Sequence, residues 1–378
     1  MMQDRNSGID VLRGVAIILV MQLHMLTFTM AMNEMGAPEW VIRILRYGWA
    51  GVEIFFVMSA YLLTSNLLRH RGESNLTSAF YIRRALRILP LYWILLLIGS
   101  LARAWWLSSG GEEQFWLWAY QPPMIFYVLF LQNWITGWVG VPFAHFYSPT
   151  WSLAVEEHFY LGLPLLIAWL SPRRLFWLAL ALIVSGPIIR ACLVNTHGPA
   201  AAYYWSIAHM DAFCWGMLLA LAQHVRPDLL KQLSPRQSAL AAAALIVIAS
   251  FAAPEMRNYK DTTLGVTLAA LAGALALLAA IQSRAAPAKT PTFLTNSLAW
   301  CGRRCYSLYL LHMPIMGMIF IAAGWTSPPL ASDGGLPIIM IAVVATFFIA
   351  ALTYRWIELP VMSLADRVAP YARVRTGG

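Results

Sequence analysis

Residues 11–32 read VLRGVAIILVMQLHMLTFTMAM, an apolar run that is interrupted by one arginine and one histidine. A helix needs about 20 mostly apolar residues to cross the hydrocarbon core of a bilayer, and this run is long enough. Arg13 and His24 are energetically unfavourable in such a helix, because inserting a charge at bilayer depth costs about 2.5–3.5 kcal/mol on insertion scales. The run therefore predicts a first membrane-spanning helix that carries functional side chains.

The spacing of Arg13 and His24 places both side chains on one face of that helix. Eleven steps at about 100° per residue come within about 20° of three full turns, and the two residues lie about 16 Å apart along the axis. A donor that enters from the cytoplasm would meet Arg13 with its anionic part and His24 with its reactive end. The alternative is a snorkelling arginine and a core histidine that is bonded to a neighbouring helix.

Composition extends the membrane assignment to the whole chain. Hydrophobic residues make up 60% of the 378 positions and charged residues 11%, whereas soluble domains contain about 25% charged residues. The net charge of +9 comes from basic residues in short loops between apolar runs, which is typical of topology signals, so no nucleic acid is expected as a partner. The four cysteines form no CxxC pair, and no metal site is expected.

Nine further apolar runs are long enough to span, which makes about ten transmembrane helices. We predict an all-α fold, a polytopic membrane helix bundle around a central cavity. An additional aromatic-rich stretch, 114–137, is broken by Pro122 and Pro123. The nine runs are 47–68, 86–107, 151–171, 174–194, 204–223, 236–253, 262–282, 303–323 and 337–357.

The positive-inside rule indicates that 114–137 does not cross the membrane. With a cytoplasmic N-terminus and ten spans, twenty of the 26 basic residues face the cytoplasm. Both termini are then cytoplasmic, and 108–150 becomes one long outer segment, either a lid or re-entrant element over a cavity or a partly ordered loop. We expect a membrane-embedded domain over 5–362 and a short basic cytoplasmic tail over 363–378. The six basic residues expected outside are Arg43, Arg46, Arg103, Arg190, Arg257 and Lys260.

Two arginines stand between the second and third spans, in the stretch FYIRRALRILPLY over 80–92. Arg84 and Arg87 are three residues apart on a helix, so they can point together at one phosphate-bearing ligand. An ordinary positive-inside anchor is the alternative reading of these charges.

The fourth span opens with WSLAVEEHFY over 151–160. The dipole at a helix N-terminus stabilises acids and can account for one of the two adjacent carboxylates. We expect at least one of Glu156 and Glu157 to be functional, beside the titratable His158.

Other ionisable residues lie in the later spans. His312 stands in YSLYLLHMP over 306–314 and is a further candidate for the site. We expect Glu53 and Asp211 to pair with basic groups across helices. We expect Glu358 to form a structural pair with Arg355.

These segments together resemble the acyltransferase-3 family of bacterial multi-pass membrane proteins. Six motifs occur in the family's order across almost the whole chain, which makes the resemblance specific. They are Asp10 to Gly14 leading to His24, GVEIFFVMS over 51–59, Arg84-x-x-Arg87 with Pro90 and Tyr92, Trp151 to Leu153 through Glu156 and Glu157, Tyr306 to His312, and Glu358 to Pro360.

The resemblance implies O-acyl transfer in a bacterial inner membrane, commonly of acetyl from acetyl-CoA. The implied acceptors are carbohydrates, such as the sugars of surface polysaccharides, lipopolysaccharide, peptidoglycan or macrolides. The family's Arg-x10-His motif maps onto Arg13 and His24, and its Arg-x-x-Arg motif onto Arg84 and Arg87. The chain departs from the family pattern at Ala60 (Gly is usual), at His158 (Gln is usual) and at Cys305 (Ser is common).

Acyl transfer to an alcohol needs a base, stabilisation of an oxyanion and positioning of both substrates. His24 is the candidate base, because imidazole titrates near neutrality, and Glu156 or Glu157 would orient that imidazole or the acceptor. His312 would donate to the oxyanion or help to bind the donor. The coenzyme A phosphates would be held by the three arginines, Arg13, Arg84 and Arg87. A transporter or exporter of a sugar or lipid-linked intermediate is the alternative that also explains intramembrane charges.

Overall fold

The computed structural model describes residues 7–27, 37–113, 115–140, 145–253, 261–283, 292–325 and 334–372. The described residues form helices and connecting turns, and no β-strand occurs among them. The end of the first predicted span, 28–32, the end of the predicted tail, 373–378, and several basic residues of the topology argument lie outside the described residues. These basic residues are Arg5, Arg257, Lys260, Arg284, Lys289, Arg373 and Arg375.

The helices follow one another through the chain with short connections. They are α1 (Ser7–Gln22), α2 (Glu39–Arg46), α3 (Ala50–Arg69), α4 (Leu76–Ser108), α5 (Met124–Val128), α6 (Gln132–Val139), α7 (Thr150–Trp169), α8 (Pro172–His197), α9 (Pro199–Tyr204), α10 (Met210–Val225), α11 (Pro235–Ala252), α12 (Val266–Gln282), α13 (Phe293–Arg303), α14 (Cys305–Ala322), α15 (Leu336–Thr353) and α16 (Leu359–Val368).

Eight helical segments of the described chain are long and apolar enough to cross a membrane. The prediction of an all-α polytopic membrane helix bundle is thereby confirmed. The eight segments are Ser7–Met25, Glu39–Arg69, Leu76–Ser108, Pro172–His197, Pro235–Ala252, Asp261–Gln282, Cys305–Ala322 and Leu336–Val368.

The two remaining predicted spans correspond to α7 and α10. Helix α10 has 16 residues, which is short for a span, and α7 carries Glu156, Glu157 and His158 within 20 residues. Both helices pack against α3 inside the bundle. Of the ten predicted spans, these two are therefore the ones that are too short or too polar to count as apolar spanning helices.

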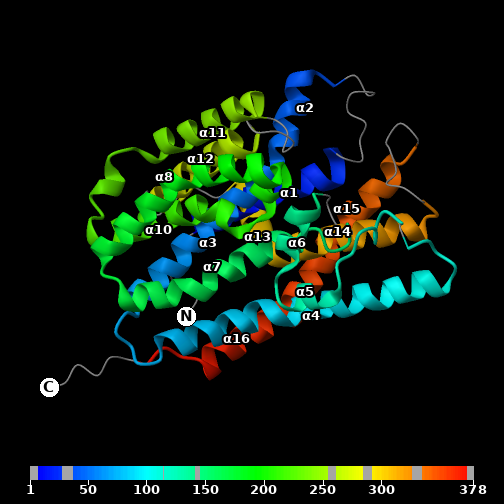
Figure 1. Ribbon diagram of the computed structural model, residues 1–378, viewed down its shortest axis with the longest axis horizontal. Coiled ribbons are helices and arrows are strands. Elements are labelled where there is room, and N and C mark those ends of the chain that lie inside the picture. Colours follow the sequence, from blue (N-terminus) through cyan, green and yellow to red (C-terminus); the bar gives the residue numbers. More distant parts are fainter. Residues whose placement is uncertain are drawn as a thin grey trace.

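Helix α3 lies at the centre of the bundle, in contact with α1, α7, α10 and α12. Figure 1 shows α11 beside α12 along one edge and α4 beside α16 along the opposite edge. Two glycines let α1 and α13 approach backbone to backbone, since a Cβ at Gly14 would overlap the carbonyl of Leu298 and one at Gly302 would overlap that of Asp10. Small residues allow such close helix packing in membrane proteins.

The connecting segment 109–149, which contains α5 and α6, packs into the bundle through aromatic side chains. Trp118, Tyr127 and Tyr147 are each about 1% exposed. Tyr92 on α4 donates a hydrogen bond to the carbonyl of Tyr127 at 2.8 Å. The described part of the predicted outer segment 108–150 is thus anchored in the bundle by buried side chains.

The chain after the predicted last span, 337–357, continues as a helix that packs along α4. Helix α16 continues to Val368, and Arg83 forms an ion pair with Asp366 at 2.5 Å. The side chain of Asn75 donates to the carbonyl of Pro370 and accepts from the backbone N–H of Ala372, both at 2.8 Å. The first part of the predicted tail is therefore bound to the bundle.

Candidate functional site

A cavity lies between α1, α3, α4, α7 and α14 and has an empty volume of about 880 Å³, which includes space open to solvent. Three arginines and one glutamate stand in its wall among apolar side chains. The polar lining residues are Arg13, Ser59, Arg84, Arg87, Ser152, Glu156, Tyr160, Cys305, Tyr306 and Tyr309.

A second cavity of about 600 Å³ adjoins the first. The two share Arg13, Arg87, Cys305 and Tyr306 in their walls. The second cavity continues to Arg303 and to residues at the end of the α15 span, among them Glu358. Arg13 and Arg87 therefore stand where the two spaces meet.

Arg84 and Arg87 face the cavity from consecutive turns of α4. Neither forms an ion pair or a hydrogen bond with another residue in the described part of the chain. Arg13, by contrast, pairs with Asp10 at 3.4 Å. A guanidinium inside a membrane domain normally finds an anion, so this pair of cations is suited to an anionic ligand.

The three titratable residues of α7 point in different directions, because successive helical residues turn by about 100°. Glu156 lines the cavity. Glu157 does not line it, and its buried Oε1 has no hydrogen-bond partner among the described residues. The Nδ1 of His158 lies 2.6 Å from the hydroxyl of Ser206 and thus faces away from the cavity. Of the two candidate acids, Glu156 is the one that the fold presents to a ligand.

His24 and His312 meet inside the bundle. The Nδ1 of His24 lies 3.0 Å from the Nε2 of His312, and their rings stack with centroids 5.2 Å apart. His24 lies in a π-helical turn, Leu23–Thr27, that follows α1. Such turns inside helices often occur at functional sites. The sequence argument assumed a regular α-helix and did not foresee this turn.

The hydrogen bonds of His312 assign the tautomers of the pair. The Nδ1 of His312 lies 2.6 Å from the carbonyl oxygen of Tyr309, which can only accept, so Nδ1 carries the proton. The Nε2 of neutral His312 then accepts from the Nδ1–H of His24, which leaves the lone pair of neutral His24 on Nε2. Both nitrogens of His312 are engaged, so this conformation does not support the expected role as a donor to the oxyanion.

The histidine pair lies behind the cavity wall. Neither His24 nor His312 is among the described residues that line the cavity, whereas Phe55 and Tyr309 are. The rings of Phe55 and Tyr309 meet edge to face at 6.2 Å, and the ring of Tyr309 is 6.0 Å from that of His312. The hydroxyl of Tyr309 bonds that of Ser152 at 2.5 Å.

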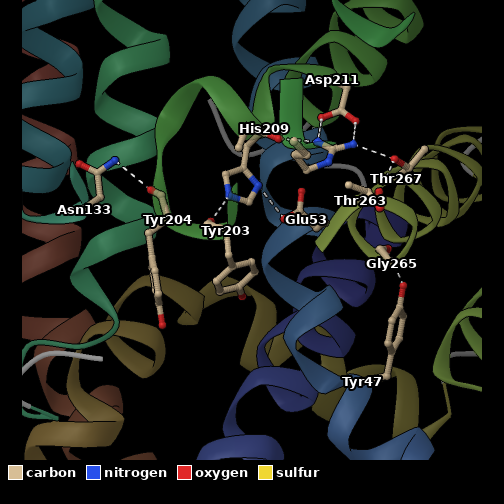
Figure 2. A network of polar contacts seen from close by, with 12 residues as sticks. Tyr47, Glu53, Asn133, Tyr203, Tyr204, His209, Asp211, Thr263, Gly265 and Thr267 are labelled. Atoms are coloured by element: carbon tan, nitrogen blue, oxygen red, sulfur yellow. Dashed lines mark hydrogen bonds and ion pairs between the residues drawn. The ribbon is translucent and has the colours of Figure 1, made fainter. Parts of the chain in front are cut away.

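The expected structural pairs of buried acids form with one exception. His209 lies 2.8 Å from Glu53, and Figure 2 shows it between that carboxylate and the Tyr203 backbone. Arg190 donates to both oxygens of Asp211, at 2.8 and 2.6 Å (Figure 2).

The exception is Glu358, because the prediction that it pairs with Arg355 is wrong. Glu358 accepts a hydrogen bond from the buried Ser307, whereas Arg355 is exposed and takes no part in the ion pairs of the described chain. Both residues follow α15 in a π-helical turn, Tyr354–Glu358. A π-helical turn places residues three apart differently from an α-helix, in which they are neighbours.

Sequence reasoning missed the hydroxyl groups of the cavity wall. Ser59 bonds Tyr160, and Tyr306 donates to the backbone carbonyl of Ile88 at 2.7 Å. Tyr306, Tyr309 and His312 follow one another on α14 at intervals of three residues. That repeated spacing of three was the signal that could have identified a polar stripe on one face of the helix.

Comparisons with known proteins place this helix bundle among acyltransferases. A family model described as an acyltransferase domain matches residues 6–355. The chain is 27% identical over 374 residues to the peptidoglycan O-acetyltransferase OatA of Listeria monocytogenes, covering 94% of this chain and 55% of the relative. It is 27% identical over 385 residues to the putative peptidoglycan O-acetyltransferase YrhL of Bacillus subtilis, with 95% and 55% covered.

A putative O-acetyltransferase of Staphylococcus aureus (strain COL) is 24% identical over 380 residues, with 93% of this chain and 56% of the relative covered. The chain thus spans about half the length of the curated relatives that it matches. No solved structure matches it.

Proposed function

The chain belongs to the acyltransferase family whose model spans residues 6–355, and on that premise we propose that it is a membrane O-acyltransferase. The proposed reaction moves an acyl group, acetyl in the simplest case, from a cytoplasmic acyl-CoA to a hydroxyl of a carbohydrate acceptor. Family membership favours this reaction over the transporter alternative. The peptidoglycan O-acetyltransferases among its relatives support both the acetyl group and the carbohydrate.

The observation that carries the proposal is a pair of arginines, Arg84 and Arg87, in the wall of a cavity inside a membrane domain. Neither side chain forms an ion pair or a hydrogen bond with the described residues. Guanidinium groups bind phosphates through two parallel hydrogen bonds. Acyl-CoA carries phosphates at one end and the thioester at the other. We place its phosphates at these arginines and Arg13, with Arg303 of the adjoining cavity on the path of entry.

The reaction needs a base at the end of the path, and His24 is the proposed one. Its Nε2 lone pair takes the proton of the acceptor hydroxyl while the hydroxyl oxygen attacks the thioester carbonyl. The tetrahedral intermediate then expels the coenzyme A thiolate, which receives the proton, so that a C–S bond is replaced by a C–O bond. His312 holds His24 in the tautomer that this step requires.

The sequence suggested two roles for Glu156, orienting the imidazole or orienting the acceptor, and this scheme uses the second. The imidazole of His24 is oriented by His312, whereas Glu156 stands in the cavity wall, where a substrate can meet it. A carboxylate there would accept hydrogen bonds from hydroxyl or amide groups. We assign it to substrate positioning, and we assign no contact with substrate to Glu157.

The same proposal includes an orientation in the bacterial cytoplasmic membrane. Both termini would face the cytoplasm, since this arrangement keeps twenty of the 26 basic residues on that side. The connecting segment 109–149 would then face outward, where a surface glycan is available. The donor would enter from one side of the membrane and the acceptor from the other.

The test is transfer of radiolabelled acetyl from acetyl-CoA to membrane-associated glycan. Membranes that carry His24→Ala should lose this transfer, because the imidazole that takes the proton of the acceptor hydroxyl is then missing. His224→Ala is the matched control, because His224 is exposed near the end of α10 and should keep full activity. Unchanged transfer by a normally abundant, folded His24→Ala protein would remove His24 from the mechanism.

A further inference from the structure

The wall of the proposed donor cavity contains two neighbouring aromatic side chains. Phe55 on α3 and Tyr309 on α14 both line it, and their rings meet at 6.2 Å. Tyr309 also lies next to His312, with ring centroids 6.0 Å apart. The described lining of the cavity includes neither His24 nor His312. Tyr309 therefore stands between the cavity and His312, with Phe55 beside it.

Among the described residues, one hydrogen bond is made by the hydroxyl of Tyr309. Its hydroxyl lies 2.5 Å from the hydroxyl of Ser152, which is 4% exposed. The Ser152 hydroxyl lies 3.3 Å from the carbonyl of Pro149 and donates there, so it accepts the hydroxyl proton of Tyr309. This bond ties α14 to the first turn of α7.

The first turn of α7 is also fastened to the connecting segment 109–149. Gln132 on α6 donates to the carbonyl of Thr150 at 2.8 Å, and the hydroxyl of Thr150 donates to the carbonyl of Tyr147 at 2.7 Å. A shift of this segment would therefore move the residue that holds Tyr309. The proposed acceptor side of the protein is connected in this way to the two rings.

We propose that Phe55 and Tyr309 form a barrier that separates bound acyl-CoA from the His24–His312 pair, and that the Ser152–Tyr309 hydrogen bond keeps the barrier closed in the absence of acceptor. This inference rests on the proposed function. Ser152 and Tyr309 are positioning residues in this scheme, because they act on the reacting groups by keeping them apart.

The chemical reason for a barrier is competition from water. Water that reaches the thioester together with a base attacks the carbonyl carbon, the C–O bond forms and the C–S bond breaks, and coenzyme A leaves as the thiol with a free carboxylic acid. An enzyme with an open path would consume acyl-CoA without transfer. Exclusion of water from reactive intermediates is an established role of closing elements in active sites.

The experiment compares Ser152→Ala and Tyr309→Phe, which remove the hydrogen bond and keep the ring. Purified protein without carbohydrate is given acetyl-CoA, and released coenzyme A is measured by chromatography. Both variants should raise this release about tenfold. That factor corresponds to about 1.4 kcal/mol and lies at the upper end of the usual contribution of one hydrogen bond, about 0.5–1.5 kcal/mol. Phe55→Ala should raise it further.

Ser250→Ala is the matched control, because Ser250 is a buried serine of α11 that bonds within its own helix. It should release coenzyme A at the wild-type rate. Transfer of labelled acetyl to glycan in host membranes is measured alongside for every variant. Melting temperatures of all proteins identify any loss of folding.

Suppose that both variants release coenzyme A at the wild-type rate without acceptor, while the wild-type protein transfers acetyl to glycan. That result would overturn the barrier and leave the proposed function standing. Folded variants that neither transfer nor hydrolyse would overturn it as well, because the hydroxyl of Tyr309 would then act in the chemistry. If the wild-type protein consumes no acetyl-CoA even in host membranes, the proposed function fails and the barrier fails with it.

Discussion

Replacing Arg84 or Arg87 by glutamine tests whether these cations hold the donor. Each guanidinium lines the cavity and has no described protein partner, so its proposed contact is a phosphate. A hydrogen bond to a charged group contributes about 1.5–3 kcal/mol. Loss of one such contact should raise the KM for acetyl-CoA about 10- to 150-fold, at 1.4 kcal/mol per factor of ten, and change kcat little, since the contact exists in ground and transition states alike.

The assay measures initial rates of labelled acetyl transfer over a range of acetyl-CoA concentrations. Inhibition by free coenzyme A is measured too, because it reports binding without chemistry. Arg83→Gln is the matched control: Arg83 neighbours Arg84 on α4 but pairs with the exposed Asp366, and a surface pair of this kind contributes little. Its kinetic constants should stay within about twofold of wild type.

Thermal stability separates this reading from a structural one. Arg84 forms no ion pair or hydrogen bond with the described residues, so Arg84→Gln should change the melting temperature little. Wild-type KM and wild-type inhibition by coenzyme A in both variants would refute the assignment of these arginines to the donor. A rise in KM for Arg83→Gln as large as that for Arg84→Gln or Arg87→Gln would also refute the assignment.

Two further predictions concern buried acids. Glu156→Gln should lower kcat/KM for transfer by about 10²-fold, the loss that misplacement of a substrate can cause. Glu157→Gln should stay within about threefold, because of the two acids only Glu156 lines the cavity. Equal losses in rate assays would contradict the orientation of α7. Arg190→Met should lower the free energy of unfolding by about 3–5 kcal/mol, because it leaves Asp211 charged and buried without its partner. The double variant with Asp211→Leu should recover most of that loss in thermal unfolding, and a double variant as unstable as the single one would contradict this account.

Much of the fold could be predicted from local sequence. Runs of about 20 apolar residues specify spanning helices because the bilayer is an apolar solvent of fixed thickness. The two weakest of the ten predicted spans are α7, which carries acids in its first turns, and α10, which has too few residues. The spacing of Arg84 and Arg87 correctly placed both on one face of α4, because two residues three apart on a helix are neighbours.

The partners of the ionisable side chains could be predicted only in part. Asp211 and Glu53 were expected to find basic groups, because buried charges need partners, and they find Arg190 and His209. The identity of those partners did not follow from the sequence. The pairing of Glu358 with Ser307 was missed for the same reason.

The sequence by itself determined that this chain forms membrane helices, that it carries charges inside them, and that its motifs follow one acyltransferase family. These properties depend on the solvent around each residue and on short repeats along the chain. Only the tertiary structure decided that His24 meets His312, which is 288 residues away, that Glu156 faces the cavity in place of Glu157, and that two aromatic rings stand before the histidine pair. These contacts arise from how separate helices pack, rotate and depart from regular geometry, and no local pattern encodes which faces will meet.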